Sequence, residues 1–335
     1  MHEPQLREGG FGNLEQEKQL KLFNERFCDR LIEDSAKKEL SSSRDYLALI
    51  DDYTEELQPV GNRDGIHGGS PGTTHSKFET TDGEVWMAKS YPKDRLHRAL
   101  VDEVAANVAD QIGLTTVMSA KIGKIDGRAY SFVKWEETTG SIWEVIQKLQ
   151  LEEDDNGSFA EKLRKDQLIS IVKEHVLDWL ISNHDAHPGH FLRKNDKDLM
   201  CIDKAQAFKY LGESDERLAV DYDPNEKYNG HQNLYYMPIY NSVWQSIVDE
   251  KADLSIEEAW DEVEQVLIRV EAISDDEYEK VLQTYAVFRF EVIASEEDSR
   301  LSKDDFINLA VARKKNIRKD FEDFINALKT FNKDI

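Results

Sequence analysis

The sequence predicts an α+β fold with a small lobe built on a β-sheet and a larger, mainly helical lobe. In the first half of the chain, two strand–turn–strand patterns that turn at Asp-Gly pairs flank one helical segment. Beyond about residue 230, apolar residues recur at helical spacing almost to the end. A chain of 335 residues is long enough to build both lobes around a substantial core.

Composition restricts the classes of partner. The net charge of −24, from 67 acidic and 43 basic residues, repels phosphate backbones and anionic membrane surfaces. We therefore expect no nucleic-acid partner and no stable membrane association. The two cysteines, Cys28 and Cys201, form no CxxC motif, which fits a reducing compartment. No apolar segment long enough for a membrane span or a leader peptide is seen, so we expect a cytoplasmic protein.

The small lobe is predicted over residues 58–136, after a helical extension over 1–57 in which residues 14–40 have helical spacing. A Gly-, Ser- and Thr-rich loop opens the lobe, and a hairpin that turns at Asp82-Gly83 follows it. The next segments are a helix over 95–111 that Gly113 ends and a second hairpin, from 117 to 133, that turns at Asp126-Gly127.

The large lobe is predicted over residues 137–335. A helix over 159–181 leads into a polar loop, and a short buried strand over 199–202 carries Asp203 at its end. The remaining chain is predicted to be helical in four segments, at 241–253, 256–271, 275–295 and 303–331.

The polar loop concentrates most of the reactive chemistry. Residues 183–192 read Asn-His-Asp-Ala-His-Pro-Gly-His-Phe-Leu and contain His184, Asp185, His187 and His190. Asp203 follows Asp185 by 18 positions. A helix, a loop carrying a carboxylate and a second ligand, and a strand ending in Asp make the layout that phosphoryl transfer needs. The same side chains can also be interpreted as a metal site in their own right.

Two features of the small lobe fit a phosphate ligand. Glycines that allow close backbone approach and hydroxyl donors share the loop before the first hairpin, at Gly68, Gly69, Ser70, Gly72 and Thr73. Lys89 ends an apolar strand, and Glu103 lies on the helix that follows. Taken alone, the loop could equally be a surface linker and Lys89 an ordinary surface lysine.

Together these motifs resemble a known superfamily. Asp-Trp-Leu-Ile-Ser-Asn-His-Asp-Ala-His-Pro-Gly-His-Phe-Leu (178–192) and Ile-Asp-Lys-Ala-Gln-Ala-Phe (202–208) resemble the catalytic and metal loops of the atypical kinases, above all phosphatidylinositol 3/4-kinase-like and HipA-like kinases. The resemblance covers about residues 65–208. It implies a two-lobed protein-kinase-like fold with ATP bound between the lobes.

The resemblance also implies roles for single residues. Asp185 would be the catalytic aspartate, braced by His187, and Asp203 would be the main metal ligand. Lys89 would contact the nucleotide phosphates while Glu103 holds it. The glycine-rich loop would cover the phosphates, and the segment at 132–136, with Val133, would carry the adenine. The expected function is transfer of the γ-phosphate of ATP to a hydroxyl acceptor, with a protein or peptide favoured.

Two positions depart from the family pattern. His190 stands where the family has a metal-binding Asn, and Ala205 where it has Gly. We expect His190 to join Asp203 at the metal, with Mg²⁺ as the expected ion and Mn²⁺ as the alternative. Imidazole suits Mg²⁺ less well than an amide oxygen does. The departures fit a changed metal preference, an unusual transfer reaction, or a degenerate kinase that binds nucleotide without turnover.

Two other functions compete with the kinase hypothesis. A non-catalytic nucleotide sensor or scaffold would keep the fold and use the C-terminal helices for partners. A metal-dependent hydrolase would use His184, Asp185, His187 and His190 to activate water. Pro188-Gly189 interrupts any helix that would align these histidines, and the hydrolase hypothesis leaves Lys89 unexplained.

Overall fold

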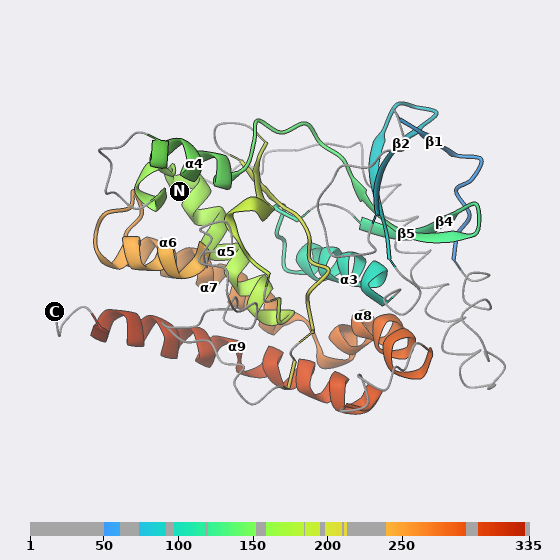
Figure 1. Cartoon of the computed structure of the whole chain (residues 1–335). Helices are drawn as coiled ribbons and strands as arrows, with labels where there is room; N and C mark the ends of the chain where they lie inside the picture. Colours follow the sequence, from blue (N-terminus) through green and yellow to red (C-terminus); the bar gives the residue numbers. More distant parts are fainter. Residues whose placement is uncertain are drawn as a thin grey trace, which may run out of the picture.

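The computed structural model is an α+β structure with a curled antiparallel sheet and helices beside and below it (Figure 1). The predicted extension helix at 14–40, His184, and the loop residues Gly68, Gly69, Ser70, Gly72 and Thr73 lie outside the described residues. The structure describes residues 50–60, 74–91, 97–117, 120–151, 159–183, 185–194, 198–209, 211–212, 239–292 and 301–331.

The five-stranded sheet has the order β1-β2-β3-β5-β4, and neighbouring strands are antiparallel. Both predicted Asp-Gly turns are confirmed. Gly83 adopts a φ of +88°, and Asp126 and Gly127 adopt +51° and +73°, the left-handed values that tight hairpins require. The strands are β1 (Leu57–Pro59), β2 (Thr74–Thr80), β3 (Val85–Ser90), β4 (Ala120–Ile125) and β5 (Arg128–Lys134).

One helix, α3 (His97–Gln111), connects β3 to β4 and lies between the sheet and the C-terminal helices (Figure 1). Its predicted end is confirmed, because Gly113 has a φ of +67°. The amide of Leu114 then donates to the carbonyl of Ala109 at 2.9 Å, which pairs an otherwise open carbonyl of the last turn.

The predicted helix at 159–181 is divided in the structure into a short 3₁₀ turn and α5. A second, two-stranded hairpin of β6 and β7 follows it. Neither β6 nor helix α4 was predicted. These elements are α4 (Ile142–Leu151), the turn η2 (Phe159–Lys162), α5 (Lys165–Leu180), the turn η3 (Pro188–His190), β6 (Phe191–Arg193) and β7 (Leu199–Cys201).

The C-terminal helices agree with the predicted segments within a few residues, and the last one agrees at both ends. Ser255 and Ser274 begin two of them by accepting hydrogen bonds from the amides of Glu258 and Glu277, while both glutamates bond back to the serine amides. The helices are α6 (Ile239–Val248), α7 (Ile256–Ala272), α8 (Asp275–Val287), the π-helical turn η6 (Phe288–Val292) and α9 (Lys303–Phe331).

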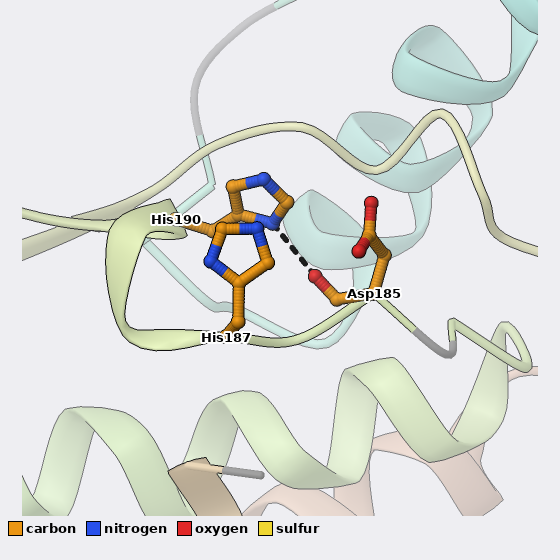
Figure 2. A group of neighbouring side chains, drawn as sticks. All are labelled: Asp185, His187 and His190. Carbon is orange, nitrogen blue, oxygen red and sulfur yellow. Dashed lines mark hydrogen bonds between the residues drawn. The ribbon is translucent and has the colours of Figure 1, made fainter. Parts of the chain in front are cut away.

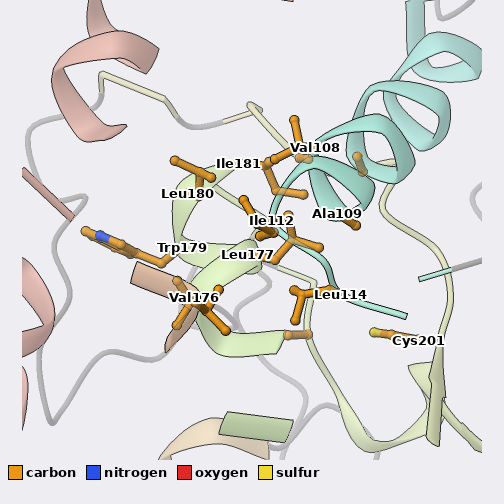
Figure 3. Close-up of a cluster of buried hydrophobic side chains, with 14 of the residues drawn as sticks. Val108, Ala109, Ile112, Leu114, Val176, Leu177, Trp179, Leu180, Ile181 and Cys201 are labelled. Atoms are coloured by element: carbon orange, nitrogen blue, oxygen red, sulfur yellow. The ribbon is translucent and has the colours of Figure 1, made fainter. Parts of the chain in front are cut away.

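A single apolar core joins α3 to the C-terminal helices. Val108 of α3 and Ile112, which follows it, belong to the same buried cluster as Leu177 and Leu180 of α5, and Figure 3 shows these side chains close together. The helix that follows Lys89 is therefore fixed to the helix that precedes the polar loop. The division into residues 1–57, 58–136 and 137–335 stays a prediction.

Among the described residues, no helix is both long enough and apolar enough to cross a membrane.

Candidate functional site

The polar loop begins where α5 ends, and its first hydrogen bonds set the position of Asp185. Ser182 has a φ of +50°, which turns the chain out of the helix. The amide side chain of Asn183 donates to Oδ1 of Asp178 at 2.9 Å, and its own Oδ1 accepts the backbone N–H of Asp185 at 3.3 Å. Asp185 is therefore held at a defined distance from the end of α5.

Three side chains of the loop meet in space. One potential ligand atom from each of Asp185, His187 and His190 lies within 4.8 Å of the others (Figure 2). Nδ1 of His190 is 2.7 Å from the carbonyl oxygen of Asp185, and the two imidazole rings lie 3.6 Å apart between centroids. The proline that begins η3 folds the chain back so that the two rings lie close together, tilted by 39°.

Asp203, in the segment that follows β7, lies close to the histidines of the polar loop. It follows β7 and has a φ of +62°, a conformation that a non-glycine residue seldom adopts. Its carboxylate lies 3.2 Å from Nζ of Lys89 and 3.8 Å from Nε2 of His190. The side chain of Asp203 stays 34% exposed, whereas that of Lys89 is 8% exposed, so the carboxylate forms the open side of the pair.

The helix partner predicted for Lys89 needs correction. Asp102 lies 3.7 Å from Nζ of Lys89, and it takes the place expected for Glu103. Consecutive helix residues point about 100° apart, so only one of the two faces a given strand residue. Asp102 also accepts from the hydroxyl of Ser131 at 2.9 Å and from the backbone N–H of Lys204 at 3.1 Å. Glu103 is buried too, and its charge contributes to the raised pKa of Tyr53.

The loop residues have strongly shifted acidities. Burial raises the pKa of Asp185 to about 6, against the effect of His190. A carboxyl group with such a pKa can exchange a proton with a hydroxyl group near neutral pH. Burial also lowers the pKa of His187 to about 2, so this imidazole is neutral.

Lys89 and the carboxylates next to it form an electrostatic cluster. Burial alone would lower the pKa of Lys89, but Asp102 and Asp203 outweigh it and hold the pKa above its ordinary value. Burial opposes ionisation of Asp203 as well, yet Lys89 and His190 keep its pKa below the usual range. Two carboxylates, those of Asp102 and Asp203, thus lie beside one lysine, and Asp185 is near enough to feel the charge of Asp203, so this excess of negative charge suits a cation.

The donor set fits a divalent metal. Asp203 offers a partly exposed carboxylate and His190 a ring nitrogen directed toward it, while Asp185 lies on the other side of His190. When bound there, a divalent ion would supply positive charge that neutralises phosphate oxygens.

Val133 lies close to the segment that carries Asp203, because it belongs to the same apolar group as Met200 and Ile202. It belongs to β5, pairs with Met87 of β3 and is 8% exposed. Its buried neighbours are Ala106, Ala120 and Met200, and Leu192 and Ile202 of the β6–β7 segment pack against them. The result is an apolar group between the five-stranded sheet and the hairpin that carries Asp203. That Val133 contacts a nucleotide stays a prediction.

A second lysine cluster lies next to the first, around Lys204, whose backbone N–H bonds to Asp102. No sequence pattern predicted it. Nζ of Lys204 contacts Glu174 at 2.6 Å, Asp178 at 2.5 Å and the sulfur of Cys201 at 3.2 Å. Tyr240 donates its hydroxyl hydrogen to the other oxygen of Asp178. All five side chains are buried, so this cluster belongs to the interior of the protein. It could not be expected from the sequence, because Glu174 and Tyr240 lie 30 and 36 positions from Lys204.

Comparisons with known proteins give weak likenesses. No protein-family model matches the sequence, and no curated protein matches it. Among solved structures, a proinflammatory kinase of Helicobacter pylori, CtkA, is similar with a TM-score of 0.46 and 13% identity, over 85% of this chain and 99% of that one. HipA of Shewanella oneidensis, in a complex with HipB and operator DNA, is similar with a TM-score of 0.43 and 10% identity, over 82% and 74%.

At such low similarity, the roles of individual residues have to come from this chain's own geometry.

Proposed function

We propose that this chain is an ATP-dependent phosphotransferase, a two-lobed kinase-like enzyme that transfers the γ-phosphate to a hydroxyl group. The observation that carries the proposal is the contact of 3.2 Å between Nζ of Lys89 and Oδ1 of Asp203. A strand lysine and a loop carboxylate that meet beside a second aspartate form the arrangement that holds nucleotide phosphates and a metal.

Each residue would then have a distinct task. Lys89, fixed by Asp102, would contact the phosphates under the loop that contains Gly68–Thr73. Asp203 and His190 would hold the divalent ion. Asp185 would orient the acceptor hydroxyl and accept its proton, while His187 supports the loop. The adenine would lie against the apolar group around Val133. An acceptor on a protein or peptide is favoured because the acidic surface disfavours anionic membranes.

The hydrolase hypothesis loses support from the hydrogen bonds of the loop. Nδ1 of His187 accepts the backbone N–H of Gly189 at 3.1 Å, so in the neutral ring the other nitrogen carries the proton. A protonated nitrogen is no metal ligand, which leaves Asp185 and His190 as the only candidate ligands among the three side chains of that cluster.

The decisive test is Asp185→Asn. We expect transfer of labelled γ-phosphate from ATP, to the protein itself or to an added acceptor, to fall by about 10²- to 10⁴-fold, because the base is lost. The increase in melting temperature that ATP and metal produce should persist. Asp166→Asn, which changes an exposed aspartate at the start of α5, is the matched control and should leave transfer unchanged.

Three outcomes would contradict the proposal. Wild-type transfer by Asp185→Asn would remove the catalytic assignment. A wild-type protein that ATP stabilises but that transfers no phosphate would be a nucleotide sensor. Hydrolysis of a phosphoester with Zn²⁺ and no nucleotide would restore the hydrolase hypothesis.

A further inference from the structure

The two adjacent histidines of the loop, His187 and His190, present opposite ring nitrogens for bonding. His187 accepts a hydrogen bond at Nδ1 from the amide of Gly189. His190 does the reverse: its Nδ1 lies 2.7 Å from the carbonyl oxygen of Asp185, and a carbonyl oxygen can only accept. In a neutral His190 ring, Nδ1 therefore carries the proton and Nε2 carries the lone pair.

The lone pair of His190 is directed at a carboxylate that it cannot hydrogen-bond. Its Nε2 is 3.8 Å from Oδ2 of Asp203, which is too long for a hydrogen bond. Two ligands of one metal ion, each about 2.0–2.2 Å from it, can be as much as about 4.2 Å apart. A separation of 3.8 Å therefore leaves room for a shared ion and is unsuited to a direct contact.

The ring of His190 is also fixed before any ion arrives. It lies against the ring of His187 at a centroid distance of 3.6 Å. The amide of His190 donates to the carbonyl of His187 at 2.9 Å, and its carbonyl accepts the amide of Ile202 at 3.0 Å. The last bond ties the loop to the segment that carries Asp203. An imidazole whose second nitrogen donates to a carbonyl is the arrangement that metal-binding histidines adopt in proteins.

We propose that His190 is a metal ligand and that it makes this site selective for Mn²⁺ over Mg²⁺. The inference rests on the proposed function, because it names the metal of that same site. Mg²⁺ binds oxygen ligands almost exclusively, whereas Mn²⁺ accepts imidazole together with carboxylate and phosphate oxygens. The histidine at position 190 is thus a selectivity determinant.

Mn²⁺ binding to the full chain tests this directly, without turnover. Free Mn²⁺ is measured by its electron paramagnetic resonance signal, with and without competing Mg²⁺, and nitrogen ligation by the hyperfine coupling of bound Mn²⁺. Growth with ¹⁵N-histidine should change that coupling to the ¹⁵N pattern. His190→Asn replaces the imidazole by an amide and should remove the coupling. It should also lower the Mn²⁺-over-Mg²⁺ preference about tenfold or more.

His97→Gln, which removes an imidazole at the start of α3, is the control and should keep both the coupling and the preference. Thermal melting of each variant verifies that it is folded. Bound Mn²⁺ without nitrogen coupling, or an unchanged metal preference in folded His190→Asn, overturns the inference, as does a wild-type protein that binds no Mn²⁺.

The two proposals fail separately. Nitrogen-coupled Mn²⁺ in a protein that transfers no phosphate would leave the metal assignment standing and remove the phosphotransferase. If Mg²⁺ supports transfer equally in the wild type and in His190→Asn, and bound Mn²⁺ shows no nitrogen coupling, the metal assignment is removed and the phosphotransferase stands.

Discussion

Two consecutive residues, Asp203 and Lys204, belong to two different clusters. Each cluster has one lysine and two carboxylates, but one is partly exposed to solvent and the other is buried. The open cluster, named for the partly exposed carboxylate of Asp203, consists of Lys89, Asp102 and Asp203, with contacts of 3.2 and 3.7 Å. The buried cluster consists of Lys204, Glu174 and Asp178, with contacts of 2.6 and 2.5 Å and side-chain exposures of 3% or less.

The difference lies in how completely the charges are satisfied. In the buried cluster, Asp178 is bonded by Lys204, Asn183 and Tyr240, and every group is withdrawn from water. Such a network fixes structure and has no position left for a ligand. In the open cluster, the carboxylate of Asp203 is still partly exposed to solvent, and Lys89 contacts it through one oxygen, Oδ1. The left-handed turn at Asp203 separates the two by sending successive side chains in different directions.

The largest expected effect comes from replacing each lysine by methionine. Lys204→Met leaves Glu174 and Asp178 without their buried partner and should lower the free energy of unfolding by about 3–5 kcal/mol. Lys89→Met should lower it by only about 1–2 kcal/mol, because Asp203 reaches water and Asp102 keeps two hydrogen bonds. Urea unfolding of both variants measures the contrast.

Phosphate transfer should rank the same two variants in the reverse order: the more stable variant, Lys89→Met, should be the one that loses activity. Lys89→Met should lose transfer while it stays folded. If Lys89→Met proved the less stable of the two, the assignment of one cluster to structure and the other to ligand binding would be wrong.

A smaller effect distinguishes the two neighbouring acids of α3. Asp102→Asn weakens the hold on Lys89 and should raise the KM for ATP by about tenfold, the equivalent of about 1.4 kcal/mol. Glu103→Gln changes an equally buried carboxylate that the sequence alone favoured, and it should alter KM much less. Steady-state kinetics at saturating acceptor measures both. A larger effect from Glu103→Gln would restore the original assignment.

The pair of acids also illustrates what the sequence could and could not predict. The Asp-Gly turns, the stop at Gly113 and both ends of α9 were predicted correctly, because backbone conformation and helical periodicity are local properties. That Lys89 and Asp203 share a site followed from the resemblance to the atypical kinases. Which acid of α3 faces Lys89 depends on the rotation of the helix against the sheet, and residue spacing does not encode it.

The buried cluster was unpredictable for a related reason. Lys204 had no expected role, since its partners come from the middle of α5 and from Tyr240 at the start of α6. A lysine that follows a metal-loop aspartate is ordinarily expected at the surface. Only the packing of α5 against β7 and α6 shows that this one is enclosed.

The last expected effect concerns pH, and it tests whether a buried histidine that contacts the buried cluster changes the stability of the protein with pH. His175 stacks on Tyr240 with 4.2 Å between ring centroids, and its Nδ1 accepts the indole N–H of Trp244 at 3.0 Å. Burial lowers the pKa of His175 to about 3, whereas an unfolded histidine has a pKa of about 6.5. Between these values the unfolded chain binds a proton that the folded chain refuses.

The free energy of unfolding contributed by His175 should therefore fall as the pH falls from about 6.5 toward 3, by about 1.4 kcal/mol per pH unit. His175→Gln, which cannot take up a proton, should reduce the pH slope of stability by that amount over this range, whatever its stability at pH 7. Urea unfolding at pH 7, 6 and 5 compares the slopes. Equal slopes in the two proteins would mean that the ring is already protonated in the folded state, which its contact with the Trp244 donor forbids.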